Sequence, residues 1–535
     1  MASADRAAAI DGKAGRQADL IIGIDAGTSV IKAVAFALSG RQVGSAAVPN
    51  RYRSGADGSA TQSLPQTWAD CVTALRGLGS TVENLAARTA AIAVTGQGDG
   101  TWLVGRDNAP VADAWLWLDA RAAPTVAALS AGPLSRARFE ATGTGLNTCQ
   151  QGSQIAHMDR HLPELLASAE TALHCKDWLY LKLTGMRATD PSEASFTFGN
   201  FRSRRYDDTV IAALGLEHRR SLLPEIIDGT LTTHGLTADA AAEAGLIAGT
   251  PVSLGYVDMV MTALGAGVVG GGGHDVACSV IGSTGVHMRA TRYEKVHLNA
   301  AGSGYVIALP IPGLVTQVQT NMATTLNIDW VLGLAAGILR EAGQEVAQAD
   351  LVGRIEAWLG ASAPGQLLYQ PYVSEAGERG PFVNADARAG FIGLSMKHGY
   401  ADLVRAVIEG LGMAMRDCYL AMGQLPGELR LSGGAARSRA LRAILSAATQ
   451  APVRVSAREE AGAAGAAMMA AVAIGAYPDM QACIDEWVTP QLGPVEPADS
   501  ALAATYERIF PAFAEARTAL APVWGTLAAA RRGMV

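Results

Sequence analysis

The sequence predicts a mixed α/β protein made of two related halves. Its 535 residues exceed one ordinary domain and suggest roughly two to four domains. Short apolar runs alternate with helix-like stretches and end in polar loops, which is typical of strands that deliver side chains to a site. Each half also begins with two apolar strands joined by a turn of small and hydroxyl residues, at 27–29 and 282–284. Two units of this kind indicate an internal duplication.

The first half is predicted to begin with the strand pair 21–36. The elements expected after it are an apolar run at 43–48, a helix at 68–78, a buried strand at 90–95, a strand pair at 101–104 and 114–118, and mainly helices from 124 to 250. Residues 177–185 fit an amphipathic helix that ends at a C-cap glycine. The strand 250–255 then delivers Asp258, and the glycine run 270–273 is taken as the domain boundary.

The second half repeats this pattern. Its expected elements are strands at 275–280, 286–290, 428–431 and 453–455, helices at 439–449 and 461–473, and a surface helix at 506–532. The helix at 461–473 consists mostly of small residues, which suits close packing against its neighbours.

Composition excludes several classes of protein. Hydrophobic residues make up 49% and charged residues 17%, so the chain can build large cores. The net charge of −7 argues against binding nucleic acid through bulk charge. The six cysteines form no C-x-x-C pair, which makes a zinc site or disulfide framework improbable. The chain lacks about 20 consecutive strongly apolar residues, so no membrane span is expected. The first 18 residues lack an apolar core, so we interpret them as a disordered leader and expect a cytoplasmic protein.

Two turns have the residue types of a nucleotide site. In the first, Asp25 precedes Gly27, Thr28 and Ser29, which offer a carboxylate for a metal and N–H and hydroxyl groups for phosphates. The spacing is not that of a P-loop, and a plain chain reversal is the alternative. In the second, Gly433 and Gly434 lie between a strand and a helix, where an anionic or planar ligand can approach. A simple strand-to-helix turn is the alternative there.

Taken together, the motifs resemble those of the FGGY carbohydrate kinases over residues 20 to 485. The matching stretches, in the family's order, are 23–29, 95–100 with 117–121, 255–258, 282–285, 371–372 with 378–381, 405–410 and 432–438. The resemblance implies the two-domain actin-like (ribonuclease H-like) ATPase fold with a cleft between the domains. It places the polyol and the catalytic base on an N-terminal domain, 19–270, and ATP on a C-terminal domain, 271–485, followed by a helical tail, 486–535.

The resemblance also implies roles for individual residues. Asp258 is the expected general base, although the amide residue that usually follows it is Met259 here. Asp25 is the expected Mg²⁺ carboxylate, acting through bound water. The remaining nucleotide contacts expected are Gly27, Thr28, Ser29, Gly282, Ser283 and Thr284 for the phosphates, and Gly433, Gly434 and Arg437 for the adenosine. Bonding of the hydroxyls to the local backbone, a solvated loop position for Asp258 and a plain surface charge for Arg437 remain alternatives.

The substrate loops depart from the best-known members of the family. Glycerol kinases have Arg-Glu, and xylulose kinases Met-His, where this chain has Gly98-Asp99, and the frequent Pro-Tyr is Thr148-Cys149. The expected substrate contacts are Gln97, Asp99, Trp117, Asp119, Asn147, Gln150 and Gln151, a set that suits a neutral polyhydroxylated molecule; any of them can instead be a loop or core residue.

These stretches are most similar to those of erythritol kinases, which phosphorylate a terminal hydroxyl of a four-carbon polyol. Kinases of other polyols or ketoses (glycerol, xylitol, xylulose, ribulose) are the alternatives, and a non-kinase actin-like ATPase that binds a polypeptide is a third. A small-molecule polyol is therefore the expected partner, with no nucleic acid, no membrane and a possible homodimer.

Overall fold

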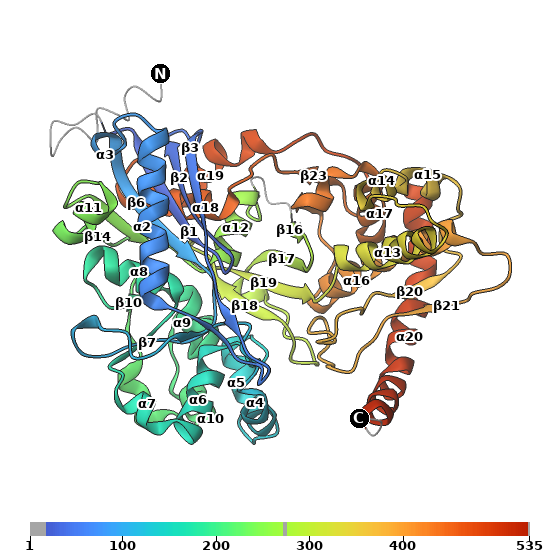
Figure 1. Cartoon of the computed structure of the whole chain (residues 1–535), viewed down its shortest axis with the longest axis horizontal. Helices are drawn as coiled ribbons and strands as arrows, with labels where there is room; N and C mark the ends of the chain where they lie inside the picture. The colour runs from blue at the N-terminus through green and yellow to red at the C-terminus, as the bar shows by residue number, and fades with distance from the viewer. Residues whose placement is uncertain (1–17, 271–274, 533–535) are drawn as a thin grey trace.

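Figure 1 shows a computed structural model of the chain, which describes residues 18–270 and 275–532. Within these ranges the main strands form two six-stranded sheets, each at the centre of one lobe. The leader predicted for residues 1–18 lies outside the described residues except for Ala18, and so does most of the glycine run 270–273. The domain boundary placed there stays a prediction.

The first sheet combines parallel and antiparallel strands in the order β14-β15-β6-β1-β2-β3. Its strands are β1 (Leu20–Ala26), β2 (Val30–Ala37), β3 (Gln42–Pro49), β6 (Thr89–Gly96), β14 (Thr233–Gly235) and β15 (Pro251–Leu254). β1, β6 and β15 are parallel neighbours, whereas β1, β2 and β3 form an antiparallel meander. The first expected hairpin is therefore present.

The second sheet repeats this arrangement, in the order β18-β19-β17-β16-β22-β23. Its strands are β16 (Val276–Ile281), β17 (Gly285–Arg292), β18 (Tyr305–Ala308), β19 (Leu314–Asn321), β22 (Glu428–Ser432) and β23 (Val453–Val455). β16, β22 and β23 are parallel, whereas β16, β17 and β19 are antiparallel neighbours, with β18 at the edge beyond β19. The shared order of strands supports the predicted duplication.

A layer of two helices lies between the sheets. α12 (Asp258–Ala266) and α18 (Ala461–Ala473) share one hydrophobic core with Ile21 of the first sheet and Met288 of the second. α18 approaches β1 so closely that a Cβ at Gly23 would lie 2.2 Å from the carbonyl oxygen of Ala463. Figure 1 accordingly shows α18 and α19 (Met480–Trp487), late in the chain, on the first lobe.

The opposite face of the first sheet is covered by helices that precede residue 250. Alternate residues of β1, among them Leu20, Ile22 and Ile24, pack against α2 (Leu64–Thr81) and α8 (Cys175–Thr184), because successive side chains of a strand point to opposite faces. Both faces of β1 are thus covered, which explains its nearly continuous apolar sequence.

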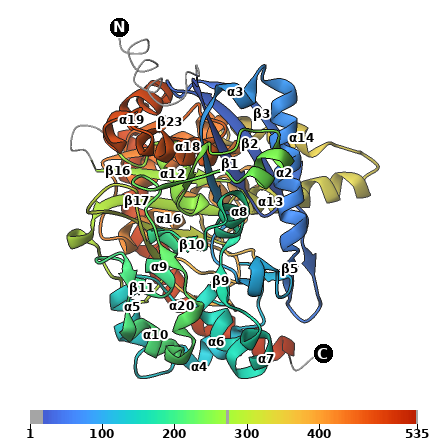
Figure 2. The same ribbon diagram turned by 90° about the vertical axis from the view of Figure 1, so that its left-hand side faces the viewer.

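The remaining elements complete the lobes, as Figure 2 shows from the side. The first lobe adds α3 (Leu85–Arg88), α4 (Ala123–Ser130), α5 (Ser135–Thr142), α6 (Gln151–His161), α7 (Pro163–Ala167), α9 (Pro191–Thr197), α10 (Asp208–Leu214), α11 (Ala238–Ala244), β4 (Arg53–Ser54), β5 (Ala60–Gln62), β7 (Trp102–Val104), β8 (Ala114–Trp115), β9 (Thr171–Leu173), β10 (Ala188–Thr189), β11 (Gly199–Asn200), β12 (Arg205–Tyr206) and β13 (Glu225–Ile226). The second adds α13 (Thr325–Glu341), α14 (Gln348–Val352), α15 (Ile355–Gly360), α16 (Tyr400–Ala421), α17 (Arg439–Thr449), α20 (Ser500–Arg532), β20 (Leu368–Gln370) and β21 (Gly390–Ile392).

Three sequence-based expectations need correction. β7 and β8 are not a strand pair: β7 pairs with β9 and β8 with β5, and only a single bridge joins Thr101 to Trp115. α8 ends at Gly185 as predicted but is not amphipathic, because it is buried on nearly every side. α2 begins earlier than expected, at Leu64, because the hydroxyl of Ser63 caps its N-terminus.

None of the helices described here has the length and apolar character required to cross a membrane.

Candidate active site

The predicted site residues of the first lobe follow three neighbouring parallel strands. β15, β6 and β1 lie side by side, with Leu254 opposite Val94 and Asp25 opposite Thr95. Their carboxyl ends therefore meet at one edge of the sheet, the usual place for a site in such sheets. The Thr95 hydroxyl donates to the carbonyl of Tyr256 at 2.6 Å, which holds the ends of β6 and β15 together.

Asp25 lies at the end of β1 and is half-buried. Lys32, its partner across the hairpin, binds the carboxylate of Glu460 at 2.8 Å, and no described residue donates a hydrogen bond to Asp25. Burial raises the pKa of Asp25 to about 6, a shift that the charge of Lys32 reduces and that of Glu460 increases. An acid left unpaired in this way is available to a cation or to a water bound to one.

Asp258 is the first residue of α12 and follows the end of β15. The backbone N–H of Met259 donates to its Oδ1 at 2.6 Å. Burial raises the pKa of Asp258 to about 8, with the negative charges of Asp25 and Asp99 adding to the shift. A carboxylate with a raised pKa is a stronger base, as the predicted role requires.

Asp99 lies in the loop after β6, with a left-handed backbone (φ 56°). Its Oδ1 is buried and has no hydrogen-bond partner among the described residues. Burial raises its pKa to about 6, although a hydrogen bond from Cys149 opposes the shift. An unpartnered buried carboxylate oxygen is costly, so this atom is suited to accept a hydroxyl of a bound molecule.

Gln97 joins the substrate loop to the first phosphate loop. Its amide accepts from the Thr28 hydroxyl at 3.0 Å and donates to Gln62 at 2.7 Å. The same Thr28 hydroxyl accepts from the indole N–H of half-buried Trp117 at 2.8 Å. Both the Gln97 amide and the Thr28 hydroxyl are thus already engaged within the protein, whereas the exposed hydroxyl of Ser29 has no described partner.

Three further predicted substrate residues bind within the protein. The carboxylate of Asp119 accepts from Ala60 N–H at 2.9 Å and forms a 2.6 Å ion pair with Arg121. The buried amide of Gln150 bonds to Arg138 and to the Gly145 carbonyl. Gln151 donates to the carbonyl of Leu173 at 2.7 Å. Their contact with a substrate stays a prediction, whereas their support of the loops is observed.

Asn147 lies where the two lobes meet. Its side-chain N–H₂ lies 3.5 Å from the hydroxyl of Tyr305, the first residue of β18, and that hydroxyl is 3.8 Å from Cys149 Sγ. Gly145 N–H also donates to the carbonyl of Gly304 at 2.9 Å. Tyr305 therefore brings a second-lobe hydroxyl to the substrate loops. The sequence analysis missed it, because no local pattern distinguishes it from a core tyrosine.

The second lobe presents its predicted nucleotide residues at the ends of two parallel neighbours, β16 and β22. Ser283 and Thr284 are exposed, and the loop is braced by N–H groups of Thr324 and Thr325 that donate to its carbonyls. Gly433 (φ 94°) packs against Ile281, so that a Cβ there would lie 2.6 Å from the Ile281 carbonyl oxygen. Exposed Gly434 and Arg437 bound the 3₁₀ turn that leads into α17. Gly282 and the glycine pair thus share one edge of the second sheet.

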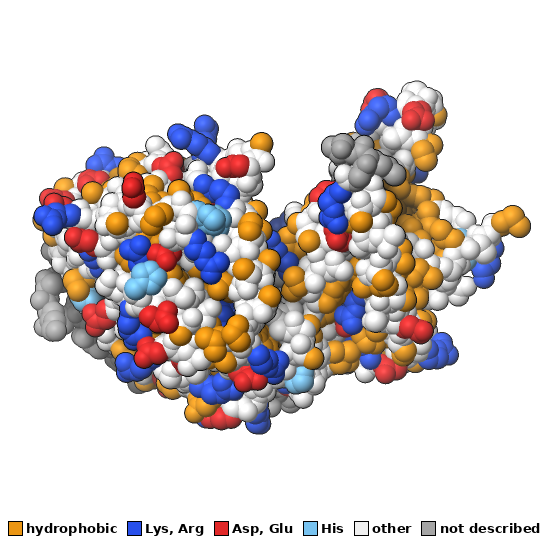
Figure 3. Space-filling model, turned by 90° about the horizontal axis from the view of Figure 1, so that it is seen from below, with side chains coloured by type: hydrophobic (Ala, Val, Ile, Leu, Met, Phe, Trp, Pro, Cys, Tyr) orange, Lys and Arg blue, Asp and Glu red, His pale blue; other side chains and the backbone are white. Residues whose placement is uncertain are grey.

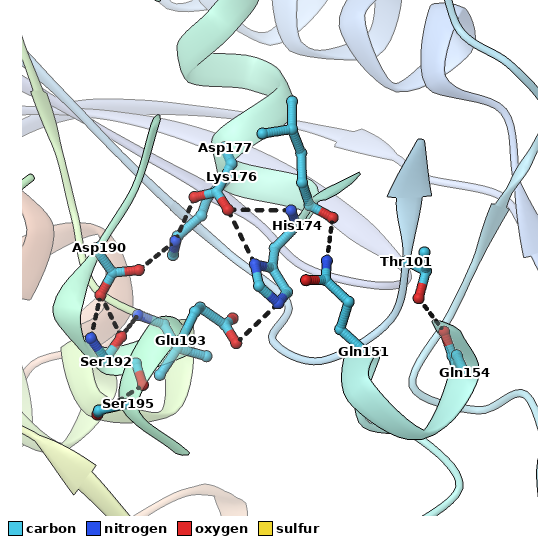
Figure 4. Close-up of polar contacts among 12 residues, drawn as sticks. Thr101, Gln151, Gln154, His174, Lys176, Asp177, Asp190, Ser192, Glu193 and Ser195 are labelled. Carbon is cyan, nitrogen blue, oxygen red and sulfur yellow. Dashed lines mark hydrogen bonds and ion pairs between the residues drawn. The ribbon is translucent and has the colours of Figure 1, made fainter. Parts of the chain in front are cut away.

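A buried cluster of charged side chains lies at the N-terminal ends of α8 and α9, as Figure 4 shows. Lys176 is fully buried and contacts Asp177 at 2.6 Å and Asp190 at 2.5 Å. His174 Nδ1 is 2.9 Å from Asp177, and its Nε2 is 3.5 Å from Glu193. The Asp190-Pro191 pair is a recognisable helix-start pattern, but the contacts of Lys176 with Asp190 are not visible in the sequence.

No group of three or more His, Cys, Asp or Glu side chains suited to hold a metal ion occurs in the described ranges. A metal at Asp25 would therefore take most of its ligands from phosphate oxygens and water, which is the habit of Mg²⁺. Figure 3 shows the molecule hollowed between the two lobes.

This fold and these motifs define a sugar kinase. Residues 20–265 match the N-terminal domain of the FGGY family of carbohydrate kinases, and residues 277–474 match its C-terminal domain. The chain belongs to this family, and the predicted family and two-domain actin-like fold are confirmed.

Known relatives agree with this assignment. The erythritol kinase of Brucella abortus (strain 2308) is 69% identical over 513 residues, which cover 96% of this chain and 98% of that protein. The crystal structure of xylulose kinase from Rhodospirillum rubrum superimposes with a TM-score of 0.84 at 26% identity, covering 95% of this chain and all of that one (100%). Gluconate kinase from Lactobacillus acidophilus shares the fold, with a TM-score of 0.85 at 20% identity and coverage of 95% and 99%.

Proposed function

We propose that this chain transfers the terminal phosphoryl group of ATP to a terminal hydroxyl of erythritol, giving erythritol 4-phosphate and ADP. The observation that carries the substrate is the 69% identity to an erythritol kinase over nearly the whole of both chains. Membership of a kinase family implies ATP as the phosphoryl donor. The polyol is placed on the first lobe and ATP mainly on the second.

Asp258 is proposed as the general base. It accepts the proton of the attacking hydroxyl while that oxygen bonds to the γ-phosphorus and the bond to the β–γ bridging oxygen breaks. Two observations support this role: Asp258 stands at the edge of the sheet where three loops meet, and its Oδ2 has no hydrogen-bond donor among the described residues. Its pKa, raised to about 8, gives it the basicity that the step needs.

The phosphates are proposed to lie between the two hairpin turns. Gly27 and Ser29 on one side, and Gly282, Ser283 and Thr284 on the other, have exposed or half-buried backbone and hydroxyl groups. For Thr28 the backbone N–H is the available group, because its hydroxyl already bonds Gln97 and Trp117. The adenosine is placed beside Gly433, Gly434 and Arg437, at the end of β22.

Mg²⁺ is proposed to bind near Asp25, and the residues present fit it. The carboxylate has no donor among its described neighbours, and Lys32 is paired with Glu460, so the negative charge of Asp25 is only partly compensated. When bound, the ion neutralises the charge of the triphosphate. Asp25 would hold the ion through bound water.

A polyol fits the open polar atoms of the first lobe. The unpartnered Oδ1 of Asp99 is an acceptor for a hydroxyl, and Asn147 and the Tyr305 hydroxyl lie on the neighbouring loops. Trp117 offers an apolar ring for the carbon chain. Position 98, where glycerol kinases have Arg, is Gly in this chain. The loss of that cation agrees with a substrate that has no anionic group.

ATP turnover with and without erythritol tests the proposal against the other class of actin-like ATPase. Strong stimulation by erythritol, with one erythritol phosphate formed per ADP, is expected. Turnover that no polyol changes but that a polypeptide stimulates would contradict it. A cytoplasmic location and a homodimer remain predictions.

A further inference from the structure

The short helix α9 touches the residues that precede both proposed site carboxylates. Asp190 caps this helix by accepting from the N–H of Ser192 at 2.7 Å. Ser192 and Glu193, the second and third residues of the helix, are fully buried. Unlike Asp99 and Asp258, neither residue is proposed to touch the substrate.

Ser192 holds the segment that carries the proposed base. Its Oγ accepts a hydrogen bond from the backbone N–H of Val257 at 3.0 Å and donates to Asp190. Val257 is the N-cap residue of α12 and lies immediately before Asp258. Figure 4 shows Ser192 with Asp190 and Lys176 in one connected set of contacts. The position of Asp258 is therefore linked to α9 by this side-chain hydrogen bond.

Glu193 lies against the substrate loop. A Cβ added at Gly98 would be 3.2 Å from Glu193 Oε1 and 2.3 Å from a methyl group of Val257. Gly98, Val257 and Glu193 thus form one tight contact directly before Asp99 and Asp258. Oε1 of Glu193 has no hydrogen bond from a described residue, and Oε2 lies 3.5 Å from Nε2 of His174.

Buried ion pairs hold the N-terminus of α9 in place. Lys176 lies within 2.6 Å of two buried aspartates, Asp177 and Asp190. Although burial disfavours the charged form, these two carboxylates raise the pKa of Lys176, so the ammonium stays charged. Burial of Glu193 raises the pKa of that carboxyl well above its usual value, which favours a neutral side chain at this contact. Removing one member of such a set leaves a buried charge without a partner, so the set holds α9 firmly.

We propose that Ser192 and Glu193 are positioning residues, and that this one turn of α9 sets the spacing between the base Asp258 and the substrate carboxylate Asp99. This inference rests on the proposed function. A polyol hydroxyl must reach Asp258 in line with the γ-phosphorus while another hydroxyl binds Asp99. Displacements of about 1 Å in such arrangements cost on the order of 100-fold in rate.

Ser192→Ala tests the link to the base, with Ser195→Ala as the matched control. Ser195 is on the same helix and equally buried, but among the described residues its hydroxyl bonds only the carbonyl of Ser192, at 3.3 Å. In Ser192→Ala we expect kcat for erythritol to fall at least about tenfold, with nucleotide Kd unchanged. Ser195→Ala is expected to keep kcat, and Ser192→Thr, which retains a hydroxyl, to restore most of it.

Glu193→Ala tests the link to the substrate loop. We expect KM for erythritol to rise about tenfold while kcat changes less, because the loop before Asp99 loses its support. Glu193→Gln keeps the shape and is expected to retain a KM near that of the wild type. If Ser192→Ala does not fold, Ser192→Cys, which has nearly the same shape and a weaker acceptor, is expected to lower kcat in the same direction.

Equal kcat in the Ser192 and Ser195 variants would overturn the proposal, as would losses that only follow the fall in Tm. The wild type in the same assays reports separately on the proposed function. If it phosphorylates a different polyol, the variant ratios are measured with that polyol.

Discussion

Gly462 of α18 lies directly against the carboxylate of Asp25, so that a Cβ at this position would be 2.3 Å from Oδ2. The two residues are 437 positions apart in the chain. Because α18 comes from the second half of the sequence but packs on the first sheet, it forms one wall of the proposed metal site. The glycine is required here by the close approach, since its own backbone is helical.

Gly462→Ala is expected to displace Asp25 and lower kcat by about 10- to 100-fold. The concentration of Mg²⁺ needed for half-maximal rate should rise as well. Gly333→Ala in α13 is the control, because no atom of the described residues lies within 4 Å of the added Cβ. That variant should keep full activity and gain up to about 1 kcal/mol of helix stability. Unchanged Mg²⁺ dependence in Gly462→Ala would remove Asp25 from the metal site.

Asp258→Asn is expected to abolish nearly all phosphoryl transfer, by at least about 100-fold in kcat, while ATP still binds. The amide keeps the size of the side chain but accepts no proton. Calorimetric titration with ATP and steady-state kinetics separate the two effects. Asp239→Asn, at an exposed position in the first turn of α11, serves as the control and should behave as the wild type. Retained transfer in Asp258→Asn would exclude it as the base.

The two carboxylates Asp99 and Asp119 should respond differently to the same change. Asp99→Asn is expected to raise KM for the polyol by about 10- to 100-fold, the cost of a hydrogen bond to a charged acceptor. Asp119→Asn should instead lower the free energy of unfolding by about 1–3 kcal/mol, because its oxygens bind Arg121 and Ala60 N–H. Steady-state kinetics and urea unfolding of both variants make the comparison. Reversed effects would contradict the assignment of Asp99 to the substrate.

Protonation of His287 is expected to lower the free energy of unfolding in acid. It is buried between Ser279 and Asn321, and burial lowers its pKa from 6.5 to about 4. The folded protein therefore binds its proton less readily than the unfolded chain does. The contribution of His287 is complete above pH 6.5 and is lost as pH falls from 6.5 to about 4, by about 3 kcal/mol in total. Urea unfolding of the wild type and His287→Gln at several pH values should show a shallower loss in the variant; parallel curves would contradict this.

Local patterns predicted most of the architecture. The turn at 27–29, the strand before Asp258 and the helix at 439–449 follow from apolar periodicity and from small or capping residues, and the structure has each of them. The position of α18 between the sheets did not follow, because it depends on contacts with residues such as Gly23 that are more than 400 positions away. Burial of α8 on all sides was missed for the same reason.

The residues of the proposed site were likewise predicted only in part. The order of parallel strands explains why Asp25, Asp99 and Asp258 meet, since each follows a predicted strand. The sequence did not predict whether a polar loop residue binds a substrate or binds within its own loop. Asp119 and Gln150, for example, hydrogen-bond within the protein. The sequence alone does not distinguish Lys176 from an ordinary surface lysine, because its contact with Asp190 forms only in the folded protein.

The substrate is the central claim, and comparing kcat/KM across glycerol, erythritol, xylitol, ribitol, xylulose and ribulose, with ATP and Mg²⁺, tests it most directly. The account predicts the highest kcat/KM with erythritol, because the site offers hydrogen-bond acceptors for a short neutral chain of hydroxyls. A kcat/KM for erythritol below that for glycerol or for a ketose would contradict it.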